Sequence, residues 1–288
     1  MTSTRRNFIQ TTAALAAGAG LAYSKEQHML KAIGVQLYTV RDVINQNPPK
    51  TLTEISDIGY REAECIGSDL DNIIAAMAET KLKPVSLHVD SNLWKPEHTE
   101  RRTSIFADAK MKGFSYVVYP YVPNQERGGV DAIKRVAENL NNGAKDAHNN
   151  DLKVCYHNHA FEFEPVGGKT LLASLMEETD PKLVGLELDI FWVVTGGHDP
   201  LEMFKTYGSR IELVHLKDRA KPSQPHYNED VPKSTFKEVG HGAIDIPAVL
   251  KAASDVGVKH YFVEQDATPG DPVESLKQSY QYLHDLKF

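Results

Sequence analysis

The feature that most constrains this chain is a regular alternation of short apolar segments with helix-length segments, which begins at residue 32 and repeats eight times. Alternation of this kind is typical of parallel strands that are joined by crossover helices. The clearest helical segment covers residues 130–147, where apolar side chains recur at intervals of three and four. Eight strand–helix units in about 260 residues predict a single-domain α/β protein, a (β/α)₈ (TIM) barrel.

A doubly wound open sheet is the competing architecture, but no Gly-x-Gly-x-x-Gly turn follows the first expected strand. No linker or shift in composition divides the chain, so we expect one domain over residues 25–288. The long polar segment 221–235 follows the seventh expected strand and is predicted to be an active-site loop. The expected strands are Ala32–Val40, Tyr60–Ile66, Pro84–Val89, Ser115–Tyr121, Lys153–His159, Val184–Trp192, Ile211–Lys217 and His260–Glu264.

The composition excludes several classes of protein. A formal net charge of −7 argues against a nucleic-acid partner, because nucleic-acid-binding proteins usually present a basic face. The two cysteines, Cys65 and Cys155, are too few for a disulfide framework or a thiolate zinc cluster. The chain therefore has the composition of an ordinary globular protein, and its function must be sought in its motifs.

The N-terminal residues have the pattern of an export signal. Arg5 and Arg6 precede a small-residue apolar run, residues 13–22, and small residues at the exit suit cleavage near Ser24. The paired arginines resemble a twin-arginine signal, so residues 1–24 are predicted to direct the protein to the periplasm. A membrane anchor is the alternative, but the run is shorter than the roughly 20 apolar residues that span a bilayer. We therefore expect no stable membrane anchor.

Polar side chains gather where the expected strands end. In a barrel the carboxyl ends of the strands meet on one face, and that face carries the chemistry. Carboxylates or imidazoles at the ends of four consecutive strands are costly there unless they are paired or bind a ligand. Carboxylates with imidazole and without thiolate suit Mn²⁺, Mg²⁺, Co²⁺ or Zn²⁺. The residues are Gln36, Tyr38, His88, His157, His159, Glu162, Asp189, Trp192, His215, Lys217 and Glu264.

Several segments resemble the sugar phosphate isomerase/epimerase family, the xylose-isomerase-like barrels, and the resemblance covers essentially the whole chain after the signal. In better-known members, strands five to eight supply Glu, Asp, His and Glu to one divalent ion. Asp189, His215 and Glu264 match directly, and for strand five we expect Glu162, with His157 as the alternative. The segments read Ile33-Gly-Val-Gln-Leu-Tyr-Thr-Val-Arg-Asp42, Tyr156-His-Asn-His-Ala-Phe-Glu-Phe163, Leu188-Asp-Ile-Phe-Trp192, Val214-His-Leu-Lys-Asp218, Val239-Gly-His-Gly242 and Val263-Glu-Gln-Asp266.

The resemblance implies an enzyme that removes a proton alpha to the carbonyl of a sugar or keto-sugar. We expect Glu162 and Glu264 to be its acid and base, and Lys217 or His159 to stabilise the enediolate. Return of the proton gives isomerisation or epimerisation. Loss of a β-oxygen instead gives a keto-glycoside lyase or dehydratase, which is the alternative. Contacts with the carbohydrate are expected from Gln36, Tyr38, His88, His157 and Trp192.

Two further alternatives receive less support from the residues. The DNA-repair endonucleases that share this barrel need three zinc ions and a histidine where this chain has Trp192. A non-catalytic sugar-binding barrel would have no need of Asp189, His215 and Glu264 together. We therefore expect a small carbohydrate as partner, no nucleic acid, and one divalent ion in each chain. Both a monomer and a homo-oligomer are compatible with the sequence.

Overall fold

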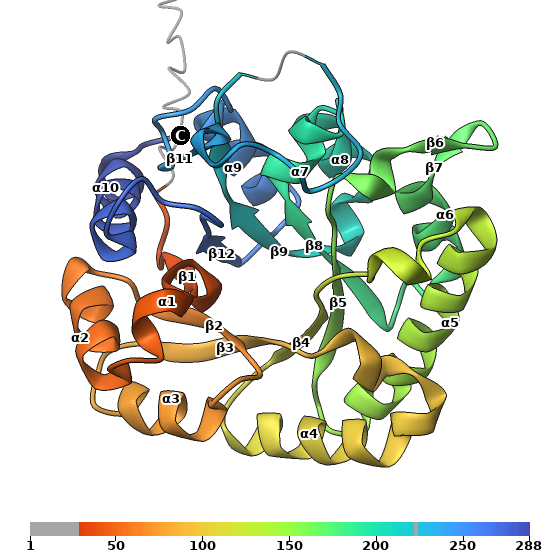
Figure 1. Ribbon diagram of the computed structural model, residues 1–288, viewed down its shortest axis with the longest axis horizontal. Coiled ribbons are helices and arrows are strands. Elements are labelled where there is room, and N and C mark those ends of the chain that lie inside the picture. Colours follow the sequence, from red (N-terminus) through yellow and green to blue (C-terminus); the bar gives the residue numbers. More distant parts are fainter. Residues whose placement is uncertain (1–28, 222–223) are drawn as a thin grey trace, which may run out of the picture.

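The computed structural model describes residues 29–221 and 224–288. Eight parallel strands close into a barrel with helices around it, which confirms the predicted single-domain TIM barrel (Figure 1). Around the barrel the strands follow the order β1-β12-β9-β8-β5-β4-β3-β2. The strands are β1 (Gly34–Gln36), β2 (Glu62–Ile66), β3 (Lys83–His88), β4 (Tyr116–Tyr119), β5 (Lys153–His157), β8 (Val184–Asp189), β9 (Ile211–Leu216) and β12 (His260–Val263).

The helices form an outer layer that covers the barrel strands (Figure 1). Two antiparallel pairs, β6 (Pro165–Val166) with β7 (Lys169–Thr170) and β10 (Asp218–Arg219) with β11 (Phe236–Lys237), lie outside the barrel sheet. The helices are α1 (Arg41–Ile44), α2 (Pro48–Ile58), α3 (Leu70–Met77), α4 (Thr99–Met111), α5 (Gly129–His148), α6 (Leu171–Glu178), α7 (Ile190–Thr195), α8 (Pro200–Tyr207), α9 (Ile246–Asp255) and α10 (Pro272–Asp285). The 3₁₀ turns are η1 (Leu37–Val40), η2 (Ser91–Trp94), η3 (Pro96–His98), η4 (Asn124–Glu126), η5 (Phe161–Phe163), η6 (Gly208–Arg210) and η7 (Lys233–Thr235).

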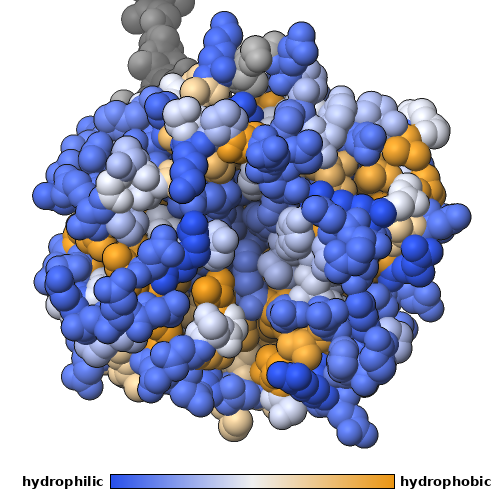
Figure 2. Space-filling model, in the orientation of Figure 1, coloured by the Kyte–Doolittle hydropathy of each residue, from blue (hydrophilic) through white to orange (hydrophobic). Residues whose placement is uncertain are grey.

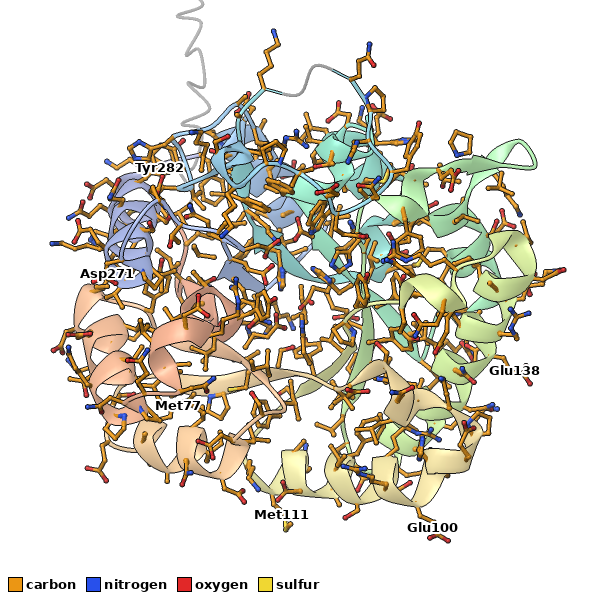
Figure 3. All side chains as sticks on the ribbon, viewed as in Figure 1. Met77, Glu100, Met111, Glu138, Asp271 and Tyr282 are labelled. Carbon is orange, nitrogen blue, oxygen red and sulfur yellow. The ribbon has the colours of Figure 1, made fainter. Side chains whose placement is uncertain are left out.

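Helix α5 shows why the outer layer forms. Its apolar stripe, which includes Ile133, Val136 and Leu140, is buried, whereas Glu138 on the opposite face points away from the barrel (Figure 3). Gly143 lies against Trp94, and a Cβ at this position would come within 2.6 Å of the indole ring. Glycine therefore permits the close approach of α5 to η2.

Two of the expected strands end three or four residues earlier than the apolar pattern suggested. The expected strand Ala32–Val40 stops at Gln36, because the Gln36 side chain accepts the backbone N–H of Tyr38 and starts the turn η1. The expected strand Val184–Trp192 stops at Asp189, whose carboxylate accepts N–H groups at the start of α7. Apolar residues continue into both turns, so hydrophobicity alone could not locate these ends.

The carboxyl ends of β5, β8, β9 and β12 lie next to one another in the barrel order. Register pairs Asp189 with His215 and Val263 with Leu216, so the polar residues at these ends lie at nearly the same height. The described part of the segment 221–235 extends over this end, where Arg127 pairs with Glu229 at 3.1 Å. The topology thus brings the residues expected at the strand ends to one mouth.

No helix in residues 29–221 and 224–288 is both long enough and apolar enough to cross a membrane. The predicted signal at residues 1–24 lies outside the described residues.

Candidate metal centre

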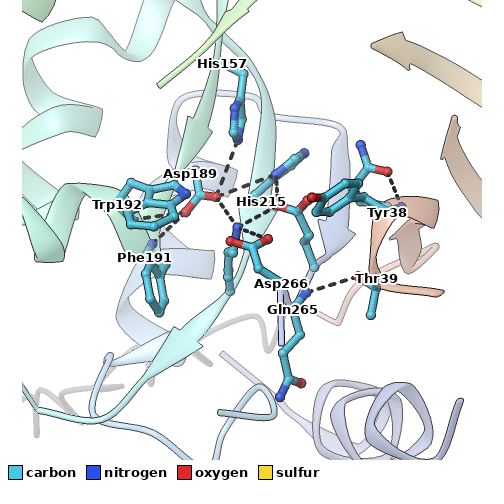
Figure 4. A network of polar contacts seen from close by, with 12 residues as sticks. Tyr38, Thr39, His157, Asp189, Phe191, Trp192, His215, Gln265 and Asp266 are labelled. Carbon is cyan, nitrogen blue, oxygen red and sulfur yellow. Dashed lines mark hydrogen bonds and ion pairs between the residues drawn. The ribbon is translucent and has the colours of Figure 1, made fainter. Parts of the chain in front are cut away.

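Four buried side chains meet at the carboxyl ends of the strands, and we call them the outer group. His157, Asp189, His215 and Glu264 each offer one donor atom, and these atoms all lie within 4.8 Å of one another. Asp189 Oδ2 lies 3.4 Å from His157 Nε2 and 3.8 Å from His215 Nδ1, and Glu264 Oε2 lies 3.0 Å from His215 Nδ1. Figure 4 shows the labelled members pointing toward one another.

The outer group fits one divalent cation. The Nε2 atom of His157 is buried and finds no hydrogen-bond partner in the part of the chain that the structure describes, although it faces a carboxylate. Burial by itself would lower the pKa of His215, but Glu187, Glu64 and Glu264 raise it well above its ordinary value. The surrounding carboxylates therefore favour a positive charge at this position, which either a proton on the ring or a metal ion in its place can supply. Two imidazoles and two carboxylates are a donor set that divalent transition metals accept.

A second set of side chains lies deeper in the barrel, and we call it the inner group. It consists of Glu64, His88 and Glu187, together with the other ring nitrogen of His215. His88 Nε2 lies 3.0 Å from Glu64 and 2.9 Å from Glu187, and His215 Nε2 lies 2.7 Å from Glu64. His215 therefore has one nitrogen in each group.

Hydrogen bonds around Glu64 determine which nitrogen of His215 carries the proton. The N–H of Tyr38 donates to Gln36 Oε1, so the Gln36 amide nitrogen faces Glu64 and donates to it at 2.9 Å. The Ser86 hydroxyl donates to the other oxygen of Glu64. Both oxygens of Glu64 thus accept hydrogen bonds, and Nε2 of His215 must also donate to this carboxylate. When the ring carries a single proton, that proton is on Nε2, and the Nδ1 lone pair would then face the outer group, as a metal ligand requires.

The charge state of Glu64 agrees with this arrangement. Burial by itself would raise the pKa of Glu64, but His88 and His215 hold it well below its ordinary value. Burial alone would likewise lower the pKa of His88, whereas Glu64 and Glu187 raise it to about 10. The carboxylates and imidazoles of the inner group therefore stabilise one another's charges next to the outer group.

Lys217 is a buried cation beside the outer group. Its Nζ atom lies 2.9 Å from Glu264, 3.3 Å from Asp189 and 2.8 Å from Asp266. Burial alone would lower the pKa of Lys217, but Asp189, Asp266 and Glu264 raise it well above its ordinary value. Lys217 is therefore charged at neutral pH and can stabilise a negative charge on a bound molecule.

His159 lies in the same cavity as a neutral imidazole. Its ring centroid is 4.8 Å from that of His157 and 5.5 Å from that of Trp192. Burial, followed by His157 and Lys217, holds its pKa well below the ordinary value. Its Nδ1 atom and the indole nitrogen of Trp192 are buried and without partners among the described residues. Both atoms are available to a ligand.

The structure does not bring Glu162 into the outer group. Strand β5 ends at His157, and the turn η5 directs Glu162 away, so that its oxygens accept the Tyr156 hydroxyl at 2.6 Å and the His159 N–H at 2.9 Å. Burial raises the pKa of Glu162 to about 8, although Tyr156 opposes the rise. His157, the sequence alternative, occupies the position expected for the strand-five ligand.

The predicted carbohydrate contacts separate into two sets. A cavity of about 1210 Å³ above the outer group is lined by Tyr38, His88, His157 and Trp192, among others. Gln36 is fully buried below it and holds Glu64. Glu64 and Glu187 were given no role in the sequence analysis, because both lie within strands. The signal that could have revealed them is a carboxylate inside an otherwise apolar segment.

The fold and the site together define a class: a (β/α)₈ barrel with a histidine–carboxylate centre of the metal-binding type at the strand ends. Residues 48–286 match the family model for the xylose isomerase-like TIM barrel. The chain belongs to this family, as the sequence resemblance implied.

The chain is also similar to individual proteins, and it spans little more than half the length of the curated relatives that it matches. It is 31% identical to an inosose dehydratase of Clostridium perfringens over 175 residues, which are 57% of this chain and 57% of that relative. A sugar phosphate isomerase/epimerase of Parabacteroides distasonis has a similar structure, with a TM-score of 0.76, 22% identity, and coverage of 88% of this chain and 98% of that one. The zinc-bound IOLI protein superposes with a TM-score of 0.68 at 18% identity, covering 87% of this chain and 95% of that protein.

The role of Glu64 leads to a prediction about metal affinity. In Glu64→Gln the amide no longer offers a charged acceptor to His215 Nε2, so the ring loses the partner that fixes its tautomer. We expect the dissociation constant for Mn²⁺ or Zn²⁺, measured by competition with a chelator, to rise about 10- to 100-fold. Glu162→Gln is the matched control, because Glu162 is equally buried but lies outside both groups. Equal affinities of the two variants would contradict the role of Glu64.

The raised pKa of Glu162 leads to a prediction about stability. In the folded protein the Glu162 carboxyl keeps its proton up to about pH 8, whereas its ordinary pKa is 4.5. The contribution of this proton to the free energy of unfolding is therefore complete below about pH 4.5, and it is lost as the pH rises to 8. Glu162→Gln mimics the protonated carboxyl and removes the loss. Relative to the unsubstituted protein, the free energy of unfolding in urea should increase by about 1–4 kcal/mol between about pH 5.5 and 8.5. Parallel pH profiles would show that Glu162 does not titrate in this range.

Proposed function

We propose that this protein is a divalent-metal-dependent lyase that abstracts a proton alpha to the carbonyl of a keto-sugar and then expels a β-oxygen. The observation that carries the proposal is the convergence of three features in one cavity: the outer group, the charged Lys217 and the neutral His159. The sequence favoured isomerisation or epimerisation and kept elimination as the alternative. The relatives named inosose dehydratase support elimination.

The outer group would hold the ion, through His157, Asp189, His215 and Glu264. When bound, the ion supplies Lewis-acid polarisation of a carbonyl and the neighbouring hydroxyl, which acidifies the adjacent C–H. Asp189 contributes to both the site and the fold. Its Oδ2 faces the outer group, and its Oδ1 accepts the backbone N–H groups of Phe191 and Trp192. The start of helix α7 and the position of this metal ligand therefore depend on the same carboxylate.

His159 is the general base in this proposal, because its Nδ1 atom is buried in the cavity and has no partner among the described residues. Glu264, which the sequence analysis assigned to this task, is better suited to ligation. Its Oε2 atom already lies 3.0 Å from His215 Nδ1 and 2.9 Å from Lys217 Nζ, so it is engaged within the centre, whereas His159 Nδ1 has no partner in residues 29–221 and 224–288. Glu162 makes no contribution as acid or base in this scheme, since both its oxygens are engaged below the cavity.

The remaining steps use Lys217 and Asp266. The Lys217 ammonium stabilises the oxyanion that forms when the C–H proton leaves. Burial, helped by Glu264 and opposed by Lys217, raises the pKa of Asp266 to about 6. Asp266 also lines the cavity, so the fraction of its carboxyl group that is protonated can deliver a proton to the departing oxygen, and this fraction falls as the pH rises above about 6. These residues would complete an elimination without a further co-reactant.

We also propose that the protein acts in the periplasm on an unphosphorylated sugar. The twin-arginine pattern at Arg5 and Arg6 supports export, and phosphorylated sugars are chiefly intracellular.

The reaction is tested in D₂O with two probes, a keto-inositol and methyl 3-keto-β-glucoside. We expect release of water or methanol together with an unsaturated ketone, and a loss of about 10²- to 10⁴-fold in kcat for His159→Gln. His198→Gln is the matched control, because His198 lies outside the cavity lining. A product that is an isomer of the substrate and carries solvent deuterium on carbon would show isomerisation or epimerisation and would contradict elimination. Absence of both exchange and product would contradict the proposal.

A further inference from the structure

The cavity above the outer group is larger than one sugar ring requires. Its volume is about 1210 Å³, whereas pockets of about 300–1,000 Å³ already enclose ligands of drug size. Figure 2 shows a hollow near the barrel axis, bordered by both hydrophilic and hydrophobic surface. The volume indicates a substrate with a second part beyond the ring that reacts at the outer group.

The wall far from the outer group comes from the segment after β2, from η2 and from α4. Helix α4 contributes Arg101, Ile105 and Asp108, which are four and three residues apart and therefore share one face of the helix. Leu70 and Leu93 line the same wall. These two leucines and Ile105 are half-buried and also pack against the main core, so their positions are fixed. The wall thus presents a preformed aliphatic surface.

The acidic side chains around this wall are already engaged within the protein. Lys112 forms ion pairs with Asp71, at 2.8 Å, and with Asp108. Asp69 accepts the side-chain amide of Asn72 at 2.6 Å. The Asp71 side chain stays 88% exposed, so the wall carries charged groups as well, and Leu70, Leu93 and Ile105 supply its aliphatic contact surface.

The two halves of the cavity therefore suit different chemistry. The half at the outer group carries charges, imidazoles and the aromatic rings of Trp192 and Phe236. The far half offers Leu70, Leu93 and Ile105 to a group that forms few hydrogen bonds. Because both halves belong to one continuous cavity, a single substrate spans them when it joins a keto-sugar ring to an apolar group.

We propose that the wall formed by Leu70, Leu93 and Ile105 is a subsite for an apolar leaving group, and that the substrate is a keto-glycoside of an aryl or alkyl alcohol. The inference rests on the proposed elimination. In a 3-keto-glycoside the base takes the proton from C2, and the C1–O bond breaks with its electron pair on oxygen. That oxygen gains a proton and leaves as the free alcohol. The sugar keeps a C1–C2 double bond conjugated with the carbonyl, so the reaction balances.

The test compares p-nitrophenyl and methyl 3-keto-β-glucosides in variants of α4. We expect Ile105→Asp to lower kcat/KM for the aryl substrate about tenfold or more relative to the methyl substrate, because a charge replaces an apolar contact. Taking the ratio within each variant cancels the different reactivity of the two leaving groups. Met111→Asp is the matched control, since Met111 is on the same helix, is 80% exposed and points away from the barrel (Figure 3). Its ratio should remain that of the unsubstituted protein.

A binding measurement keeps the test independent of turnover. Unoxidised p-nitrophenyl β-glucoside should bind the metal-loaded protein more tightly than methyl β-glucoside in calorimetry, and Ile105→Ala should remove most of the difference without adding a charge. An unchanged aryl-to-methyl ratio in both Ile105 variants, with both substrates consumed, would overturn the subsite and leave the lyase standing. No turnover of either substrate by the unsubstituted protein would instead count against the proposed function, and equal binding of the two glucosides would count against the subsite.

Discussion

The site depends on the buried hydrogen bond between His215 Nε2 and Glu64, 2.7 Å long. Because Glu64 is itself held by Gln36 and Ser86, it can only accept, and the imidazole must present Nδ1 to Asp189 and Glu264. One ring thus connects the core of the barrel to its mouth. The orientation of the candidate metal ligand is therefore fixed by the barrel itself rather than by a surface loop, which matches the rigidity that a metal site needs.

Asp189, like His215, contributes to both the fold and the site. One carboxylate oxygen caps α7, and the other faces His157, His215 and Lys217. The side-chain amide of Asn158 exchanges two hydrogen bonds with the Asp189 backbone, at 3.2 and 3.1 Å, which ties the ends of β5 and β8 together. Fold and site thus share their constraints: a change that loosens the start of α7 also moves a donor of the outer group.

The sequence was sufficient for the barrel, because eight alternating segments leave few other closed arrangements, and for the grouping of Asp189 with His215 and Glu264 at neighbouring strand ends. It was insufficient for Glu162, since the apolar pattern does not reveal the turn after His157, which turns the Glu162 carboxylate back onto the Tyr156 hydroxyl and the His159 N–H. It also gave no role to Glu64 and Glu187, whose importance depends on strands distant in sequence meeting inside the barrel. An apolar pattern shows where a strand ends only when polar residues follow the strand. After Gln36 and Asp189 the apolar residues continue into the next turn or helix, so the pattern does not mark these two ends.

The central claim is that His157, Asp189, His215 and Glu264 form one metal centre in which His215 binds through Nδ1. Crystals grown with Mn²⁺ and measured near the manganese absorption edge test it most directly. We expect one anomalous peak per chain, within coordination distance of these four side chains and on the Nδ1 side of His215. A peak on the Nε2 side, among Glu64, His88 and Glu187, or a fully occupied peak elsewhere with none at the outer group, would contradict it.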